Sequence, residues 1–496
     1  MGTIVKQSSL GLIANYAGIL LGFVNVMLIM PSILQAEQIG LINLILAVIF
    51  IVYPILDFSA AHIINRYFTH VENRQEIFNY SFLISCAGAV VFGFLFLLAK
   101  PLFIEYYQEK SPEIIPYYWL IYVASIMMSW IGLVENLAII NGKYHISIFS
   151  KEVLFRIGIS VILIALSLHL FDFNTYILLH FSMYGISGLL ILTYLKRQGY
   201  FQFSRAFPKF SPPLKKNIFR FGVITIFSGL ASVIATRIDM IMLGSMEGLK
   251  DVGIYTIAMF MSATIEVPRR AILQSSGPVI RVFFKENNIE KVAQIQYKTI
   301  MNLLLIGGFI LTLILINLES IYTIIPNGSI YSKGMWVVFF IGLSKIVDMI
   351  AGSSDEIIVS SKYYIYNFVF IIILTIISVG FNYILIPLYG LTGAAIATLI
   401  STSLIVIIKS IVLVFLFKIK PYSFKMVGTL LFYFALGGLL FLMPEFIHPI
   451  ISILIKGSIC SLMLYLFLKW TKISPEMNEL INQVLAQIKL DKWLKL

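Results

Sequence analysis

Charged side chains that lie inside long apolar segments are the residues of this sequence best suited to chemistry. A charge costs several kcal/mol to bury in a lipid bilayer, so each such residue needs a partner or a function that keeps it there. The residues of this kind are Asp57, Glu135, Arg237, Asp239, Glu266, Arg269, Arg270, Lys345, Asp348, Asp355, Glu356 and Lys409.

Four cations of this set could line a cavity that binds an anion. At about 1.5 Å per helical residue, Arg237 lies about 27 Å from the inner end of its segment and Arg269 about 25 Å from the outer end of the next. Lys345 lies about 18 Å into a third segment, near mid-membrane. Together with Arg270, these residues could form a cationic path for substrate binding. Guanidinium groups suit phosphate oxygens because they donate two parallel hydrogen bonds.

Acidic residues of the same segments could bind a coupling ion or act as gates, and the candidates are Asp57, Asp239, Asp348 and Asp355. Asp348 and Asp355 are predicted to share a helix face with Gly352, which suits close packing or a cation site. Asp239 faces away from Arg237, because helical residues two apart do not face each other. Asp57 lies near the inner end of its segment and could instead be a helix-end residue.

Structural roles are the alternative for the cations. Glu266 lies one turn before Arg269 and Arg270, so it could neutralise either of them. Lys345 and Asp348 are three residues apart and could form a closed pair, in which case loss of Lys345 would leave Asp348 unpaired.

Signatures of catalysis and metal binding are absent from the sequence. It has no G-x-x-x-x-G-K-[ST] nucleotide loop and no H-E-x-x-H zinc motif. The six histidines are scattered, and the two cysteines, Cys86 and Cys460, lie in apolar runs, where a thiol behaves as a small hydrophobe. We therefore expect no catalytic residue, no metal ion and no cofactor, and we do not expect an enzyme.

The elements that carry these charges are apolar enough to lie in lipid. Of the 496 residues, 59% are hydrophobic and 12% are charged, whereas a soluble domain has about 25% charged residues. Because a bilayer crossing takes about 20 helical residues, we predict an all-α membrane protein with about fourteen transmembrane helices. The predicted segments are 8–30, 39–61, 80–100, 116–140, 155–171, 175–195, 219–244, 252–280, 298–317, 333–360, 363–388, 391–417, 427–443 and 447–470. The long segments 252–280 and 333–360 should tilt or break, the first at Gly277-Pro278.

The distribution of basic residues predicts the orientation. With the N-terminus inside, most of the 36 Lys and Arg residues fall at the inner side of the predicted helices, which is the side that such residues favour. Both termini are therefore predicted to be cytoplasmic. The same distribution explains the net charge of +12 without a nucleic-acid partner. We expect a monomer surrounded by membrane lipid.

The predicted organisation has two lobes and a C-terminal addition. The parts are an N-terminal six-helix lobe (1–200), a basic cytoplasmic linker (201–218), a C-terminal six-helix lobe (219–417), two extra helices (418–470) and a cytoplasmic amphipathic tail (471–496). The tail has apolar residues at helical spacing, which is typical of a helix on the membrane surface.

An internal repeat supports the two lobes. The segment Ile29–Leu41 is similar to Ile241–Ile254 with one gap, and Asn141–Tyr144 is similar to Ser360–Tyr363. The two matches have nearly the same offset and lie at equivalent turns. Since each copy has an even number of helices, the lobes should be related by a pseudo-twofold axis along the membrane normal.

Two parts of the chain resemble motifs of polysaccharide exporters, the oligosaccharide flippases (Wzx-like) of the multidrug/oligosaccharidyl-lipid/polysaccharide (MOP) superfamily. Arg237–Gly244 (RIDMIMLG) and Val252–Ala258 (VGIYTIA) resemble the seventh-to-eighth helix signature, and Pro387–Thr398 (PLYGLTGAAIAT) resembles the entry to helix twelve. These motifs mark helix turns and packing. The resemblance implies a flippase that translocates undecaprenyl-pyrophosphate-linked oligosaccharide across the inner membrane for surface polysaccharide biosynthesis. Alternating access between the lobes would move the substrate, with H⁺ or Na⁺ as candidate coupling ions.

Two other functions compete with this one. A cation-coupled drug or metabolite antiporter of the same superfamily would need an acidic cavity, and the basic excess among the deepest residues disfavours it. A membrane-embedded polysaccharide polymerase would need a large outer loop with catalytic groups, whereas the predicted outer loops are short.

Overall fold

The fold is helical throughout the part that the computed structural model describes, which is residues 14–15, 17–71, 74–202, 208, 210–444 and 448–487. Nine helices within these residues are long and apolar enough to cross a membrane. The predicted all-α membrane fold is therefore confirmed, while the count of fourteen crossings stays a prediction.

Two compact units make up the chain, Met1–Gly253 and Ile254–Leu496, which we call the first and second units. The boundary lies within α11 (Leu249–Ala263), so α10 (Pro212–Met246) belongs to the first unit. The predicted linker 201–218 lies partly outside the described residues, and α10 begins within it at Pro212. The assignment of 1–200 and 219–417 to two repeated lobes stays a prediction.

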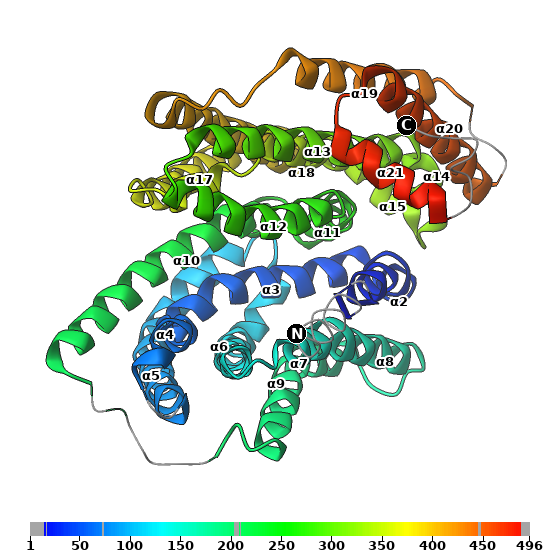
Figure 1. Ribbon diagram of the computed structural model, residues 1–496. Helices are drawn as coiled ribbons and strands as arrows, with labels where there is room; N and C mark the ends of the chain where they lie inside the picture. The colour runs from blue at the N-terminus through cyan, green and yellow to red at the C-terminus, as the bar shows by residue number, and fades with distance from the viewer. Residues whose placement is uncertain are drawn as a thin grey trace. The chain divides into compact units, whose positions relative to one another are not determined.

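In the first unit, α3 (Ala36–Asp57) is the helix around which the others pack. It contacts α5 (Arg74–Tyr107), α6 (Tyr118–Ile140) and α10, and α6 also packs against α9 (Phe173–Arg197) (Figure 1). Half of its apolar window is buried inside the protein, because its side chains are apolar on every face rather than along one stripe. The remaining α-helices of this unit are α2 (Met30–Ile33), α4 (Ala60–Tyr67), α7 (Tyr144–Ile148) and α8 (Phe155–Ser167), and Val24–Ile29 and Phe149–Leu154 are π-helical.

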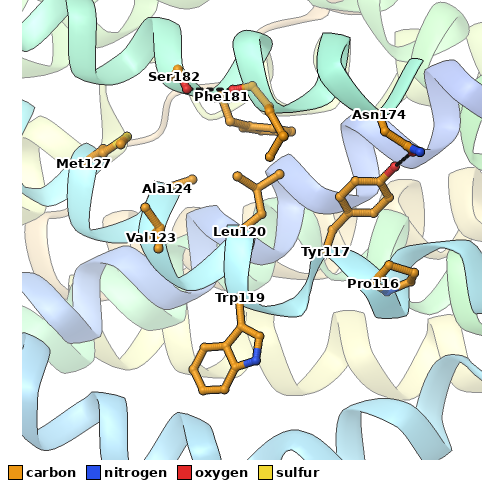
Figure 2. Close-up of a pocket in the computed structure, with 11 residues that line it drawn as sticks. Pro116, Tyr117, Trp119, Leu120, Val123, Ala124, Met127, Asn174, Phe181 and Ser182 are labelled. Atoms are coloured by element: carbon orange, nitrogen blue, oxygen red, sulfur yellow. Dashed lines mark hydrogen bonds between the residues drawn. The ribbon is translucent and has the colours of Figure 1, made fainter. Parts of the chain in front are cut away.

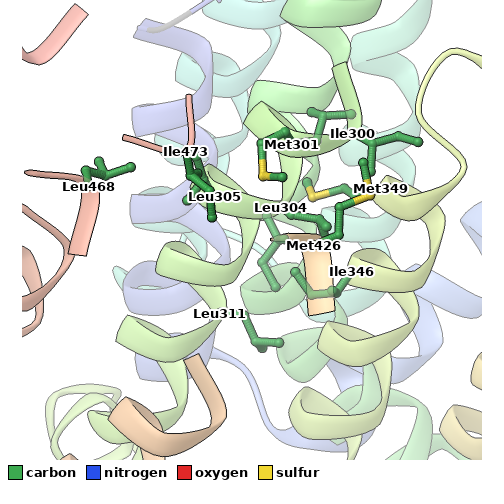
Figure 3. Close-up of a cluster of buried hydrophobic side chains, with 12 residues drawn as sticks. Ile300, Met301, Leu304, Leu305, Leu311, Ile346, Met349, Met426, Leu468 and Ile473 are labelled. Atoms are coloured by element: carbon green, nitrogen blue, oxygen red, sulfur yellow. The ribbon is translucent and has the colours of Figure 1, made fainter. Parts of the chain in front are cut away.

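The second unit is organised around α13 (Ile289–Ile316). This helix packs against α12 (Glu266–Lys285), α16 (Met335–Ile350), α19 (Phe424–Phe441) and α20 (Pro449–Thr471). Figure 3 shows the apolar cluster between them, in which side chains of α13, α16 and α19 meet, among them Met301, Leu304, Met349 and Met426. The remaining α-helices are α14 (Leu318–Ile324), α15 (Gly328–Tyr331), α17 (Ser354–Val359), α18 (Ile365–Phe417) and α21 (Pro475–Gln487).

The segment predicted at 252–280 breaks, but the predicted position was wrong. Helix α11 ends at Ala263 and α12 starts at Glu266, whereas α12 continues through Gly277 and Pro278. Pro268 gives the reason, because a proline ring clashes with the carbonyl four residues earlier, here that of Thr264, yet is tolerated in the first turn of a new helix. The break therefore lies directly before the charged residues of α12.

Two further breaks fall where glycine is the residue that tolerates a left-handed backbone. The predicted segment 333–360 divides into α16 and α17 at Gly352, whose φ is +56°. Helix α18 contains a kink at Gly390, with φ 57° and ψ −135°, between the segments predicted at 363–388 and 391–417. Both conformations are accessible to glycine at low cost.

The tail predicted to be amphipathic forms α21 (Pro475–Gln487), and residues 488–496 lie outside the described part. Met477 and Ile481 pack on the apolar cluster around α13, and Ser474 Oγ donates to Asn302 Oδ1 at 2.6 Å. The first turns of this helix are thus attached to the second unit by both apolar and polar contacts.

Candidate functional site

Glu266, the first residue of α12, binds two cations. Its Oε2 lies 3.0 Å from Lys345 Nζ of α16, and its Oε1 lies 3.4 Å from Arg270 Nε, one turn further along α12. The Glu266 and Lys345 side chains are 23% and 29% exposed, whereas Arg270 is 73% exposed. Lys345 is therefore committed to Glu266, while Arg270 keeps most of its donors open to the surroundings.

Arg269 binds Asp348 across the same two helices. Its Nε lies 3.2 Å from Oδ2 and its Nη2 lies 3.4 Å from Oδ1, so both carboxylate oxygens are used. The predicted pairing of Lys345 with Asp348 was wrong. Both side chains pair with residues of α12 instead: Lys345 with Glu266, and Asp348 with Arg269.

The break between α16 and α17 is held by Gln296, a fully buried residue of α13. Its side-chain amide donates to the Ala351 carbonyl at 2.8 Å and its carbonyl accepts from the Ser353 N–H at 2.8 Å. The second bond satisfies the Ser353 N–H at the break, while the Ala351 carbonyl also accepts the Ser354 N–H at 3.1 Å. The predicted face shared by Asp348, Gly352 and Asp355 therefore does not exist, because the chain changes direction at Gly352.

Asp355 and Glu356 lie in the first turn of α17, directly after this break. Asp355 Oδ1 lies 2.7 Å from Lys409 Nζ of α18, and Lys409 is 13% exposed. Glu356 lies beside them, and its Oε2 is buried with no hydrogen-bond donor among the described residues. Its Cγ lies 3.4 Å from the position that a Cβ on Gly277 would take, so the absence of a side chain there gives the carboxylate room.

We call these eight residues the charge cluster of the second unit. Its cations are Arg269, Arg270, Lys345 and Lys409, and its carboxylates are Glu266, Asp348, Asp355 and Glu356. The basic excess expected among the deepest residues is thus absent from this cluster. An incoming anion would have to compete with carboxylates for most of the cations, and an incoming cation would have to compete with guanidinium and ammonium groups.

Arg237 of the first unit is different, because its described partner is aromatic. Its guanidinium carbon lies 4.7 Å from the centroid of the Phe50 ring of α3, and none of the ion pairs among the described residues includes it. Asp239 is buried, and its Oδ1 accepts the Met240 N–H at 2.8 Å. The two side chains therefore do not form a contact ion pair, as their spacing predicts.

Asp57 ends α3, which confirms the helix-end interpretation, and its side chain is 6% exposed. Its Oδ1 accepts from Ser129 Oγ at 2.9 Å, and Ser129 shares a 2.8 Å hydrogen bond with Ser85. Its Oδ2 accepts the Ala61 N–H at 3.2 Å. Within the described structure this carboxylate is held by hydroxyl and amide donors, so it could take up a proton or an ion without breaking an ion pair.

The turn after Asp57 is strained. Phe58 and Ser59 both have positive φ, at 46° and 60°, and a non-glycine residue in this region costs about 1–3 kcal/mol. Ser59 Oγ donates to the carbonyl of Gly222 on α10 at 3.0 Å. Contacts of this kind hold the strained turn in place, and such turns are frequent at functional sites.

The sequence identified most of the charged residues but not their ion-pair partners. Asp57, Arg237 and Asp239 lie in the first unit, whereas Arg269, Arg270, Lys345, Asp348 and Asp355 lie in the second. Glu266, Lys409 and Glu356 carried the same signal, a charge in an apolar segment, and join the cluster. Gln296 carried no signal that periodicity or charge could detect. The described residues contain no group of three or more His, Cys, Asp or Glu side chains placed to hold a metal ion.

An apolar groove lies between α6 and α9 of the first unit. It has a volume of about 490 Å³, and its lining includes Trp119, Leu120, Met127 and Phe181 (Figure 2). At one end, Tyr117 Oη donates to Asn174 Oδ1 at 2.5 Å. Its few polar groups suit a hydrocarbon chain better than a charged ligand.

Solved structures of transporters share the fold of this chain. The lipid II flippase MurJ, in an inward closed conformation, has a TM-score of 0.70 and 13% identity over 94% of this chain and 99% of that one. An inward-facing multidrug resistance MATE transporter of the MOP superfamily has a TM-score of 0.63 and 16% identity over 86% and 98%. A MOP superfamily transporter from Pyrococcus furiosus has a TM-score of 0.58 and 16% identity over 82% and 93%.

These likenesses and the apolar helices establish a multi-pass membrane protein with the MOP fold. No curated protein sequence matches the chain. The family model described as "Polysaccharide biosynthesis protein" matches residues 4–281. Because that match covers more than half of the sequence, the chain belongs to the polysaccharide biosynthesis protein family.

Proposed function

We propose that this chain is a flippase that moves undecaprenyl-pyrophosphate-linked oligosaccharide across the inner membrane for surface polysaccharide biosynthesis. Membership of the polysaccharide biosynthesis family is the observation that carries the proposal. The MOP fold supports it, since a lipid II flippase and other transporters share that fold at low identity. Transport needs no covalent step, so we propose no enzymatic activity.

The pyrophosphate would be bound by Arg237, Arg269, Arg270 and Lys345. Arg237 and Arg270 are the cations most available for a first contact, because the described partner of Arg237 is the Phe50 ring and Arg270 is 73% exposed. Arg269 and Lys345 would follow once their carboxylates move away. In a bilayer, such side chains are the partners that a phosphate headgroup needs.

The polyprenyl tail would lie against the two C-terminal helices, α19 and α20. They present exposed apolar side chains, among them Phe434 at 83% and Trp470 at 81%. Because one polyprenyl chain is far longer than one binding pocket, an apolar helix surface suits it better than an enclosed cavity. Motion would follow alternating access between the predicted lobes, in a chain with both termini in the cytoplasm.

Reconstitution tests the proposed function directly. The purified protein is placed in vesicles with a fluorescently labelled polyprenyl-pyrophosphate oligosaccharide, and the fraction that reaches the opposite leaflet is scored with a membrane-impermeant quencher. We expect transport by the wild type and a large loss in Arg237→Ala. Transport no faster than in protein-free vesicles would overturn the proposal.

Orientation has its own experiment. Reporter fusions after Tyr200 should be active on the cytoplasmic side and fusions after Asn327 on the outer side. The reverse pattern would overturn the predicted topology, and the flippase proposal could then hold only with an inverted arrangement of the basic residues.

The second candidate is a cation-coupled drug or metabolite antiporter, and the observation that favours it is the buried Glu356 carboxylate. Four carboxylates at the charge cluster, with Glu356 lacking a described donor on Oε2, could accept a cationic compound. Uptake of a fluorescent lipophilic cation into the same vesicles separates the candidates. Cation transport without lipid-linked sugar transport would support the antiporter.

A further inference from the structure

One end of the helix pair α19 and α20 carries exposed lysines next to exposed aromatic rings. Lys425 lies in the first turn of α19, Lys469 in the last turn of α20, and Lys472 directly after α20. All three lysines are exposed. Their neighbours Phe424 and Trp470 are 96% and 81% exposed. We call these five residues the basic end of α19 and α20, and the predicted topology places it at the cytoplasmic side.

Packing brings the three lysines to one place. Each lysine has a neighbour in the sequence that is buried in the apolar cluster around α13, and these neighbours are Met426, Leu468 and Ile473 (Figure 3). The rings of Phe432 on α19 and Phe467 on α20 stack, with centroids 4.1 Å apart, about two turns or less from the lysines. The lysines therefore lie around one apolar cluster at the same end of the two helices.

The helices themselves gain little from lysine at two of these positions. Lys425 lies at the N-terminal end of α19, where a cation opposes the helix dipole, and that first turn contains no acid. Lys472 has φ 46° and ψ 40°, a left-handed conformation that glycine adopts at lower cost. A cation does favour the C-terminal end of a helix, but Lys469 already supplies one to α20.

Carboxylates do not neutralise these lysines. None of the ion pairs among the described residues includes any of the three. The acids that follow along the chain are Glu476, which Lys298 of α13 binds at 2.6 Å, and Glu479, which is exposed. The charge of the basic end is therefore open to an anion from the surroundings.

We propose that the basic end of α19 and α20 binds the headgroup of an anionic phospholipid of the membrane. Charge complementarity carries this choice, because lysines clustered directly beyond membrane helices attract anionic lipids. Tryptophan favours the boundary between membrane and water, which suits Trp470, and an exposed ring such as Phe424 can insert among acyl chains. The three cations are lysines, which act as point charges and lack the guanidinium fork that binds phosphates in two-pronged fashion. The inference is independent of the transported substrate.

Quenching of tryptophan fluorescence by brominated lipids tests the site at its own position. Trp470 becomes the single tryptophan of the full-length protein when the other four are changed to Phe, and these are Trp119, Trp130, Trp336 and Trp493. The protein is placed in phosphatidylcholine vesicles that contain a small fraction of brominated phosphatidylglycerol or of brominated phosphatidylcholine. We expect the anionic lipid to quench Trp470 at several-fold lower content than the zwitterionic lipid, and salt should weaken this preference.

Substitutions assign the preference to the lysines. Each lysine should contribute up to about fivefold to the preference for the anionic lipid, so the combination of Lys425→Gln, Lys469→Gln and Lys472→Gln should abolish it. Lys472→Gly should lower the preference by up to about fivefold without lowering the thermal stability, because glycine accepts the left-handed backbone. If the single-tryptophan protein does not fold, spin-labelled phosphatidylglycerol is used with the wild type, and its motionally restricted fraction is measured.

A matched control separates a site from general surface attraction. The combination of Lys215→Gln, Lys216→Gln and Arg220→Gln removes the same charge from exposed residues of α10 in the first unit, and it should keep the preference. Equal quenching of the otherwise unchanged single-tryptophan protein by the two lipids overturns the proposal. An equal loss in the control and in the lysine variant also overturns it, because the attraction would then depend on net charge alone. Loss in the lysine variant only supports the site, and the translocation assay decides the proposed function separately.

Discussion

Gly40 of α3 and Gly253 of α11 face each other's helices in a reciprocal contact. A Cβ on Gly40 would lie 1.9 Å from the carbonyl oxygen of Leu249, and a Cβ on Gly253 would lie 2.0 Å from that of Ala36. Leu249 precedes Gly253 by four residues, and Ala36 precedes Gly40 by four residues. The contact therefore has local twofold symmetry, and the two glycines occupy matching positions in the sequence repeat. The relation between the repeated lobes stays a prediction.

Alanine at either glycine should disrupt this contact. The added methyl group would overlap a backbone carbonyl, which cannot rotate away as a flexible side chain can, so the helices must separate. We expect Gly40→Ala and Gly253→Ala each to destabilise the protein by about 1–3 kcal/mol, the usual cost of overpacking. Thermal unfolding of the purified protein in detergent measures this.

The control for these variants is Gly229→Ala on α10. A Cβ there meets no atom within 4 Å, and alanine in a helix is favoured over glycine by about 0.5–1 kcal/mol. We therefore expect no loss of stability. Equal stability of all three variants would show that the reciprocal contact does not form in the detergent-purified protein.

The sequence predicted the kind of elements better than the way in which they meet. The apolar segments and the charged residues within them could be recognised from the sequence, because a helix in lipid must be apolar along its whole length. The break was predicted at Gly277-Pro278, whereas it lies before Glu266, two residues ahead of Pro268. Sequence alone does not show which of two prolines ends a helix. The pairing of Lys345 was wrong because sequence spacing describes one helix, whereas Glu266 reaches Lys345 from another helix. Gln296 was unpredictable, since a buried glutamine that binds a helix break has no periodic signature.

The ion pairs across α12 and α16 can be tested by double-mutant cycles. Glu266 and Lys345 are in contact, so their neutral substitutions Glu266→Gln and Lys345→Met should be coupled by about 1 kcal/mol or more. Lys345→Met and Asp348→Asn should be coupled more weakly than this, because these two residues are neighbours on α16 but each has its ion-pair partner on α12. Chemical unfolding of each single and double variant gives the coupling energies. Strong coupling only between Lys345 and Asp348 would contradict the structure.

Asp57 should be sensitive to the loss of its charge. In Asp57→Asn, the amide oxygen can accept the Ala61 N–H and the NH₂ group can donate to Ser129 Oγ, which turns its own proton to Ser85. We therefore expect a folded protein that has lost only the charge. If Asp57 binds a coupling ion or proton, transport by this variant should lose its response to an ion gradient. Ser129→Ala removes one hydrogen bond but keeps the carboxylate, so it should keep that response. Retained gradient dependence in folded Asp57→Asn would exclude a coupling role.

The attachment of α21 should weaken in acid. Partial burial by itself would raise the pKa of Glu476, but the hydrogen bond and charge of Lys298 hold this pKa below its ordinary value. Because the folded pKa is lowered, the stabilisation is present above the ordinary glutamate pKa of about 4.3 and is lost as the pH falls through the folded value. The protection factors of the α21 amides, which correct for the intrinsic pH dependence of hydrogen exchange, should therefore be constant near neutrality and fall as the pH drops below about 4.3. Glu476→Gln should lower them modestly at neutral pH, because this pair is largely exposed, with side chains 58% and 39% exposed.

Substitutions at Arg237 and Phe50 distinguish the role of the Arg237 charge from the role of its packing at the proposed substrate site. Phe50→Leu removes the ring beneath the guanidinium but keeps an apolar side chain, so we expect a loss of about 0.5–2 kcal/mol of stability, with Arg237 still able to bind an anion. Arg237→Lys keeps the charge but loses the two-pronged geometry, and it should transport lipid-linked sugar more slowly than the wild type. Arg237→Ala should abolish transport while the protein remains folded, because this cation has no carboxylate partner among the described ion pairs that its loss would leave unpaired. The decisive comparison is the translocation rate normalised to folded protein. If Arg237→Ala flips labelled substrate at the wild-type rate, Arg237 serves only to pack against Phe50, and the pyrophosphate must be bound by other residues.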